Sequence, residues 1–347
     1  MKKIAIILLL IPLLAITAYG EAVSLPPVPE QAQQYMPQEN DSLGEGIAFI
    51  LTRAISNLAP DLAEGCRLGL ILLVMGLATT MIGAYSDSVK KLCGLVCVLS
   101  STALLLGGSH SLITLGIDTV GQLNDYSKLL LPTMTTVLAS SGAITKSAML
   151  YAGCTIFSAL LATAVKTAFI PMLYMYIAVC VADRVIGDAV FVNMKKLLKW
   201  LMTWLLKLIL YVFTGYIAIS GIVTGSADAV SLRATKITLS GMIPVVGGIL
   251  SDASEAILVS ASVLKNSIGI SGMYAFFAIC IGPVLKMLIH SVVLKIAGSL
   301  TGMFSLPEHI GIIDDFSQAM SLLLAATGAN CLLLLISTVS FIQGVSL

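Results

Sequence analysis

Charged residues are scarce in this chain. Asp, Glu, Lys and Arg together make up 11% of its 347 residues, whereas about 25% is usual in soluble globular proteins. Hydrophobic residues make up 58%, and the mean hydropathy is +1.01. Because a water-soluble surface cannot be built from so few charges, we predict a polytopic all-α membrane protein whose apolar side chains face lipid.

Neither sign of charge dominates the chain, which carries a formal net charge of +1. Nucleic-acid binding needs a concentrated basic face that contacts phosphates. We therefore exclude nucleic acid as a partner and expect membrane lipid to surround most of the protein.

Catalytic and ligand-binding motifs are also missing. The sequence contains no Walker A motif, no H-E-x-x-H and no nucleophile elbow, so nothing supports an ATPase, a zinc protease or a hydrolase. The cysteines lie mostly in apolar runs, without a C-x-x-C pair or a histidine at ligand spacing. We expect no catalytic residue, no cofactor and no metal site, and we interpret the cysteines as small packing residues. They are Cys66, Cys93, Cys97, Cys154, Cys180, Cys280 and Cys331.

The first 20 residues have the pattern of a secretory signal peptide. Lys2 and Lys3 precede an apolar run over residues 4–18, and Ala18 and Gly20 are the small residues that a signal peptidase reads. The alternative is an uncleaved N-terminal anchor. Both interpretations place the following segment outside the cytoplasm.

Residues 21–66 form an acidic segment that we expect to be extracytoplasmic. Between Glu21 and Glu64 there are seven acidic residues and a single base, Arg53, and base-poor segments are typical of the exterior side. The Pro- and Gln-rich first half predicts a flexible region. Residues 43–62 have apolar residues at helical spacing, which favours an amphipathic helix on the membrane surface.

Residues 67–347 form the predicted membrane domain. Seven stretches are judged against the roughly 20 apolar residues that cross a bilayer, and the fourth is short enough to be re-entrant. They are residues 68–85, 92–117, 148–165, 169–182, 201–223, 273–294 and 316–342.

An eighth crossing is predicted at residues 129–145, although Pro132 and several hydroxyl groups interrupt its apolar run. Lys90 and Lys91 lie inside if the N-terminus is outside, and the basic loop from Arg184 to Lys199 lies inside only if residues 129–145 also cross. We therefore expect seven or eight crossings, with eight and both ends outside favoured.

Polar groups within a broken crossing are tolerated where they are buried in protein or line a watery cavity. Pro132 and Thr136 are accordingly candidate pathway-lining residues. A surface loop followed by a half-helix is the open alternative.

A basic patch with two tryptophans covers residues 195–207 and overlaps the start of the apolar run at residues 201–223. Lysines and indoles at headgroup depth usually anchor a helix at the interface, and a cytoplasmic partner-binding patch is the alternative. The four lysines are Lys195, Lys196, Lys199 and Lys207, and the indoles are Trp200 and Trp204.

Lys286 is the candidate functional residue within the membrane. A charge deep in an apolar run normally faces the bundle interior. His290 lies one turn further on, and the preceding Gly282-Pro283 pair predicts a bend that puts both polar groups on one inner face. No Asp or Glu lies in the middle of an expected crossing.

Residues 226–271 are predicted to be an amphipathic region broken by Gly and Pro rather than a crossing. Gly241, Pro244, Gly247 and Gly248 form a candidate hinge or re-entrant tip, because Gly and Pro break helices and permit close backbone approach. A plain turn between two amphipathic helices is the alternative.

Several short motifs in residues 207–283 resemble those of the stage III sporulation protein AE family, and the likeness extends over the whole mature chain. The motifs are Phe213-Thr214-Gly215-Tyr216, Ser226-Ala227-Asp228, Lys236, Ile243-Pro244-Val245-Val246-Gly247-Gly248, Ser251-Asp252-Ala253, Leu264-Lys265-Asn266, Gly269 and Gly282-Pro283.

This resemblance implies membership of the channel complex that links the mother cell to the forespore in endospore-forming bacteria. It implies a location in the mother-cell membrane around the forespore, beside a secretion-type ATPase, small membrane proteins and ring-forming ectodomain proteins. The complex is needed for late forespore gene expression, and the AE-like subunit is expected to be a channel, permease or export-gate element.

Two other functions stay open, namely a structural membrane scaffold and a stand-alone secondary transporter, and so does assembly into a homo-oligomer. The transporter is disfavoured, because it usually needs inverted repeats and carboxylates within its helices.

Overall fold

The computed structural model describes residues 26–37, 43–83, 87–242, 247–304 and 306–343, with only the backbone described over 221–266. Every regular element within these ranges is a helix, as expected where each backbone polar group must be satisfied without water. The helices are α2 (Glu30–Gln33), α3 (Leu43–Ser56), α4 (Ala59–Gly83), α5 (Asp87–Ser140), α6 (Ile144–Ala164), the π-helical turn η1 (Val165–Phe169), α7 (Ile170–Ile186), α8 (Ala189–Met242), α9 (Gly247–Thr301) and α10 (Pro307–Ile342).

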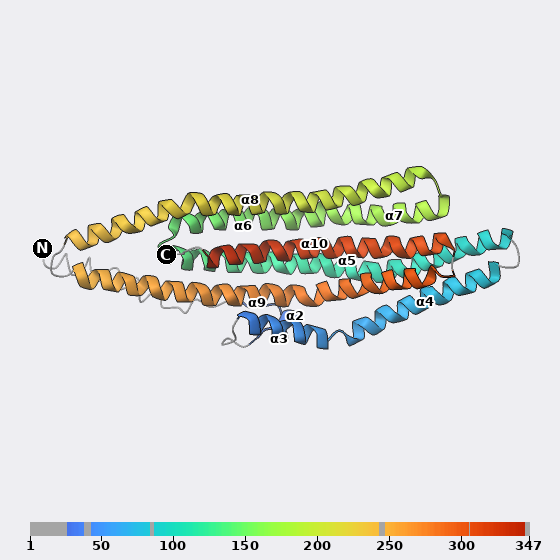
Figure 1. Ribbon diagram of the computed structural model, residues 1–347, viewed down its shortest axis with the longest axis horizontal. Coiled ribbons are helices and arrows are strands. Elements are labelled where there is room, and N and C mark those ends of the chain that lie inside the picture. Colours follow the sequence, from blue (N-terminus) through green and yellow to red (C-terminus); the bar gives the residue numbers. More distant parts are fainter. Residues whose placement is uncertain (1–25, 38–42, 84–86, 243–246, 305, 344–347) are drawn as a thin grey trace.

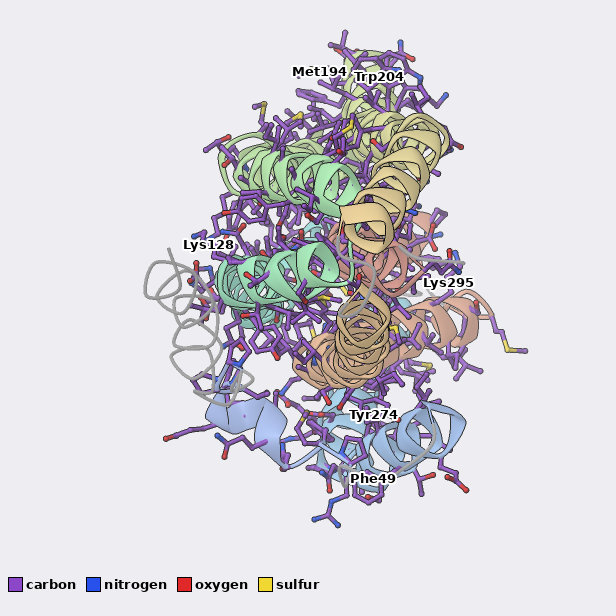
Figure 2. All side chains as sticks on the ribbon, turned by 90° about the vertical axis from the view of Figure 1, so that its left-hand side faces the viewer. Phe49, Lys128, Met194, Trp204, Tyr274 and Lys295 are labelled. Atoms are coloured by element: carbon purple, nitrogen blue, oxygen red, sulfur yellow. The ribbon has the colours of Figure 1, made fainter. Side chains whose placement is uncertain are left out.

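The long helices form an elongated antiparallel bundle with three layers (Figure 1). Helices α6, α7 and α8 make one outer layer, α5 and α10 make the middle layer, and α9 lies with α2, α3 and α4 in the third. Figure 2 shows the same order from the end of the bundle, with Trp204 on one outer surface and Phe49 on the other.

Six helical segments of the described chain are long enough and apolar enough to cross a membrane, which confirms the all-α polytopic fold. The sequence suggested seven or eight. The difference arises because two pairs of apolar runs are joined into single helical segments. The six segments are Ala59–Ile82, Val89–Ser140, Ile144–Ile186, Ala189–Ser220, Ser267–Thr301 and Pro307–Ile342.

The first fusion makes α5, whose 54 residues give a length of about 80 Å at 1.5 Å per residue. Residues 92–117 and the expected separate crossing at 129–140 both belong to it. The polar residues between these runs continue the helix, and Lys128 pairs with Asp125 across one turn at 2.7 Å. Two separate crossings would need a connection between residues 117 and 129, whereas the helix continues through them, because polarity alone does not end a helix.

The second fusion joins α6 to α7 through η1. Residues 169–182 are therefore not a separate short or re-entrant crossing but part of the continuous helical segment Ile144–Ile186. Pro171 lies just after the π turn and has no N–H to donate to the preceding turn. The π turn thus lies next to the one residue that disrupts the helical hydrogen-bond ladder.

Helix α10 is the centre of the bundle. Its most apolar window is 61% buried, against 22–39% for the other five crossing segments. It packs against α9 most extensively and also against α5, α6, α7 and α8. Phe316, Ala326, Leu333 and Phe341 are fully covered along its length.

The α7–α8 turn depends on a glycine. Gly187 has φ +75°, a left-handed conformation that favours Gly at a helix C-terminus, and its N–H donates to the Asp183 carbonyl at 3.0 Å. Asp188 then accepts a hydrogen bond from the Val190 N–H at 3.0 Å. The chain therefore reverses within a few residues and brings α8 alongside α7.

The N-terminal helices pack on α9 rather than standing apart from the bundle. Ile50 and Ala54 of α3 are buried, and Gly46 lies so close to Tyr274 that a side chain there would overlap the tyrosine ring. Phe49 and Ile55 point outward and are exposed, so the membrane-surface position expected for this helix stays a prediction.

Two sequence-based expectations lie partly or wholly outside the described residues. The signal peptide over residues 1–20 is wholly outside. Helix α8 ends at Met242 and α9 begins at Gly247, so Pro244 of the candidate hinge is outside, while Gly241, Gly247 and Gly248 lie in the flanking helix ends. Most of residues 226–271 belong to these two long helices.

Candidate functional site

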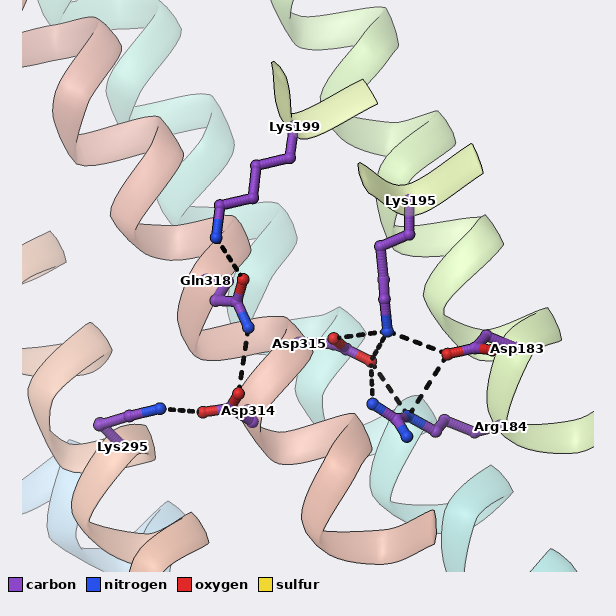
Figure 3. A network of polar contacts seen from close by, with 8 residues as sticks. All are labelled: Asp183, Arg184, Lys195, Lys199, Lys295, Asp314, Asp315 and Gln318. Carbon is purple, nitrogen blue, oxygen red and sulfur yellow. Dashed lines mark hydrogen bonds and ion pairs between the residues drawn. The ribbon is translucent and has the colours of Figure 1, made fainter. Parts of the chain in front are cut away.

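A cluster of buried ions lies where α7, α8 and α10 meet, close to the α7–α8 turn (Figure 3). Asp315 accepts hydrogen bonds from Nε and Nη2 of Arg184 at 3.1 and 2.9 Å. The Lys195 ammonium donates to both oxygens of Asp315 at 3.0 Å and to Asp183 at 2.9 Å. We call these four residues the ion quartet.

Local sequence explains how the quartet assembles. Asp183 and Arg184 occupy the last turn of α7, just before the Gly187 reversal, and Lys195 lies in the early turns of α8. Pro307 starts α10, which places Asp315 about two turns into that helix. Three helices thus each contribute at least one charge at the same level of the bundle.

Gly311 of α10 leaves room for the Arg184 guanidinium group. A Cβ atom at Gly311 would overlap the guanidinium group of Arg184. The planar guanidinium therefore packs directly on bare α10 backbone, one turn before Asp315, and this contact fixes its orientation toward the carboxylate.

The quartet is both buried and balanced in charge. The Asp183 and Asp315 side chains are 7% and 3% exposed, and those of Lys195 and Arg184 are 15% and 27% exposed. Two carboxylates and two cations leave no net charge. Buried charges persist only when they are paired in this way, because isolated ions are costly to remove from water.

A second chain of polar contacts lies beside the quartet and joins α8, α10 and α9. Lys199 donates to Gln318 at 2.7 Å, Gln318 donates to Asp314 at 3.0 Å, and Asp314 forms an ion pair with Lys295. Figure 3 shows this chain beside the quartet. The polar network therefore ties α7, α8, α9 and α10 together at one end of the bundle, which we call the basic end.

The four lysines of the predicted basic patch separate into two groups. Lys195 and Lys199 belong to the network, whereas Lys196 and Lys207 are exposed. Trp200 and Trp204 are exposed and stack with ring centroids 6.1 Å apart. Their interfacial anchoring role stays a prediction.

Lys286 and His290 lie on the side of α9 that faces α4 and α5. The Lys286 ammonium is 3.0 Å from Asp61 and 3.8 Å from Glu64, both in the first turns of α4. Nε2 of His290 is buried without a hydrogen-bond partner among the described residues. Lys286 thus links two helices, and Pro283 lies within an unbroken α9.

Pro132 and Thr136, the other candidate pathway residues, are exposed on α5. The Thr136 hydroxyl donates to the Pro132 carbonyl at 2.9 Å and so satisfies the acceptor one turn earlier. The structure does not bring these two residues together with Lys286.

A polar cavity of about 380 Å³ lies halfway along the bundle, between α2, α5, η1 and α9. We call it the mid-bundle cavity. Its polar lining consists of Gln31, Tyr35, Asp118, Thr119, Gln122, Asp125 and Lys166. Asp118 and Asp125 lie in the middle of α5, because this helix continues past residue 117. The expectation that no acid lies in the middle of a crossing stays a prediction.

The sequence did not reveal the acidic half of the ion quartet. Asp183 and Arg184 lie more than 130 residues before Asp315, and no spacing rule pairs them. The only signal was an adjacent acid pair, Asp314-Asp315, at the start of an apolar run.

Comparison with known proteins agrees with the resemblance noted in the sequence. The family model for stage III sporulation protein AE matches residues 34–344. Stage III sporulation protein AE of Bacillus subtilis (strain 168) is 22% identical over 280 residues, which cover 80% of this chain and 70% of that protein. No solved structure matches. The chain, a multi-pass helical protein, therefore belongs to the stage III sporulation protein AE family.

Proposed function

We propose that this protein is a membrane subunit of a sporulation channel complex between mother cell and forespore, in which it acts as a permease or export-gate element. The observation that carries the proposal is the mid-bundle cavity. Charged and amide groups line it, although the surrounding helices are apolar enough to cross a bilayer. Charged groups that face a cleft between membrane helices mark solute or ion pathways. Because Asp118, Asp125 and Lys166 are exposed, we assign the mid-bundle cavity to the open, extracytoplasmic mouth of such a pathway.

The spacing of the polar layers supports a position for the bilayer. Lys166 in the mid-bundle cavity and Arg184 at the basic end are 18 residues apart along η1 and α7, or about 27 Å. This separation is close to the 30 Å of a hydrocarbon core. The bilayer then lies between these two layers, with the cavity at its extracytoplasmic side.

The proposed partners follow from the family. A conduit subunit of this kind works beside a secretion-type ATPase on the cytoplasmic side and ring-forming ectodomain proteins on the other. The proposed location is the mother-cell membrane that surrounds the forespore. Helices about 80 Å long extend beyond one hydrocarbon layer and present surface to such partners.

Cysteine accessibility tests the pathway. In a background with the exposed Cys66 and the half-buried Cys93 replaced by Ser, Gln122→Cys places a thiol in the mid-bundle cavity. We expect a membrane-impermeant thiol reagent to modify it in membranes from sporulating cells. Leu106→Cys on the exposed apolar side of the same helix is the matched control and should stay unmodified.

Protection of both thiols would overturn the pathway and favour a second function, that of a structural scaffold. The observation favouring a scaffold is the closely packed α10, which fills the centre of the bundle. Substrate transport by the purified chain alone in vesicles would instead indicate a stand-alone transporter.

A further inference from the structure

A second cavity, of about 840 Å³, opens at the basic end of the bundle. It lies where the start of α5 meets the end of α7 and the start of α10. Lys90, Lys91 and Arg184 contribute its cations, and Glu308 and Asp183 its acids. We call it the end cavity.

The charges that remain free in the end cavity are mainly positive. Asp183 accepts a hydrogen bond from Lys195, and Arg184 donates hydrogen bonds from Nε and Nη2 to Asp315. Lys90 and Lys91 are exposed and have no ion-pair partner in the described part of the chain. With the ion quartet neutral, these two ammonium groups outnumber the single carboxylate of Glu308.

The remaining wall of the end cavity is apolar. Leu95, Val98, Ile186 and Leu306 contribute to it. The α5 surface beside it continues outward as a row of exposed apolar side chains, including Leu92 at 65% and Val96 at 57% exposure. An occupant that fits this site has an anionic head at the lysines and an apolar body along α5.

We propose that the end cavity binds the headgroup phosphate of an anionic phospholipid. Lys90 and Lys91 are the primary phosphate contacts, and an acyl chain lies against Leu92, Leu95 and Val96. Basic pockets between membrane helices on the cytoplasmic side are suited to such headgroups. A zwitterionic lipid fits less well, because its own cation meets the two lysines.

Lipid-dependent stabilisation of the full-length, detergent-solubilised protein tests this site. Phosphatidylglycerol should raise the Tm of the wild-type protein, and phosphatidylcholine at the same concentration should not. In the Lys90→Gln, Lys91→Gln variant the apparent affinity for phosphatidylglycerol should fall about 25-fold, since each lysine near a lipid surface contributes roughly fivefold.

A matched variant separates the site from general surface attraction. Arg53→Gln, Arg67→Gln removes the same charge from exposed positions outside the end cavity and should respond to phosphatidylglycerol like the wild type. Equal loss in both variants would refute a specific site. Native mass spectrometry of co-purified lipid gives a second readout, in which the Lys90, Lys91 variant should lose the anionic lipid adduct.

Inorganic phosphate distinguishes the two sources of the anion. At matched concentration it should leave the Tm unchanged, because it lacks the apolar body. A Tm rise with inorganic phosphate equal to that with phosphatidylglycerol would overturn the lipid assignment and give the site to a soluble phosphate.

Discussion

Asp314 and Asp315 are neighbours in sequence and differ in surroundings. Asp315 is 3% exposed and bonded to two cations, whereas Asp314 is 36% exposed and its partner Lys295 is 63% exposed. One residue therefore belongs to the interior and the other to the rim. Replacing each aspartate in turn removes the same charge, so the two variants compare the effect of a buried carboxylate on stability with that of an exposed one.

Replacing Asp315 by Asn should destabilise the protein by about 3 kcal/mol, because it leaves two buried cations with one carboxylate between them. Asp314→Asn should cost less than about 1 kcal/mol, as is usual for an exposed pair. Thermal unfolding in detergent measures both variants. Equal losses would show that the ion quartet does not hold α7, α8 and α10 together.

Only some residues of the polar network were predictable from the sequence. Lys195 and Lys199 were recognised, because basic residues cluster visibly beside tryptophans. Asp183 and Asp315 were not, because their role depends on a contact between α7 and α10 that only the folded bundle creates. The same holds for Lys286, whose acidic partners lie more than 200 residues earlier.

Helix identity was predictable from apolar runs, while helix length was not. Separate crossings were expected on either side of residues 118–128 and of residues 166–168, yet α5 continues and η1 joins α6 to α7. A polar stretch can stay helical when its side chains line a cavity or reach the bundle surface. Hydropathy windows cannot separate this case from a loop.

Close contacts between helices are set by small residues, and α6 shows one clearly. Gly153 lies directly under the ring of Tyr216 on α8, whose hydroxyl donates to the Met149 carbonyl at 2.7 Å. A Cβ at residue 153 would overlap this ring.

Gly153→Ala should therefore destabilise the bundle by roughly 1–3 kcal/mol through overpacking. Gly215, the neighbour of Tyr216, has open space at its Cβ position, so Gly215→Ala should be neutral or stabilising by less than about 1 kcal/mol. Thermal unfolding of the two variants is the measurement. Similar stability in both would contradict the close α6–α8 contact.

Across the whole molecule, the connections divide between two ends. The α4–α5, α7–α8 and α9–α10 connections lie at the basic end, while the α5–α6 turn and the C-terminal end of α10 lie toward the opposite end. Lys90, Lys91, Arg184 and Lys195 are all near the first group. Six crossings in the described chain therefore place these basic residues at one end of the bundle, as the eight crossings expected from the sequence also would.

Reporter fusions test this arrangement. Because basic segments favour the cytoplasm, a reporter fused after Asp188 should be cytoplasmic, and reporters fused after Gly142 or Gln343 should be extracytoplasmic. A cytoplasmic signal after Gly142 would mean that α5 does not cross as one helix. Phosphatase and fluorescent-protein reporters give opposite readouts and serve as mutual controls.

The central position of α10 also bears on the order in which the protein is made. This helix follows the other described helices in the chain, yet it is the one that they enclose. During synthesis, the faces of α5, α7 and α9 that contact α10 have no partner helix until α10 enters the membrane. The contacts at the centre of the described bundle therefore form only once α10 has entered the membrane, which makes them the last of its helix contacts to be completed.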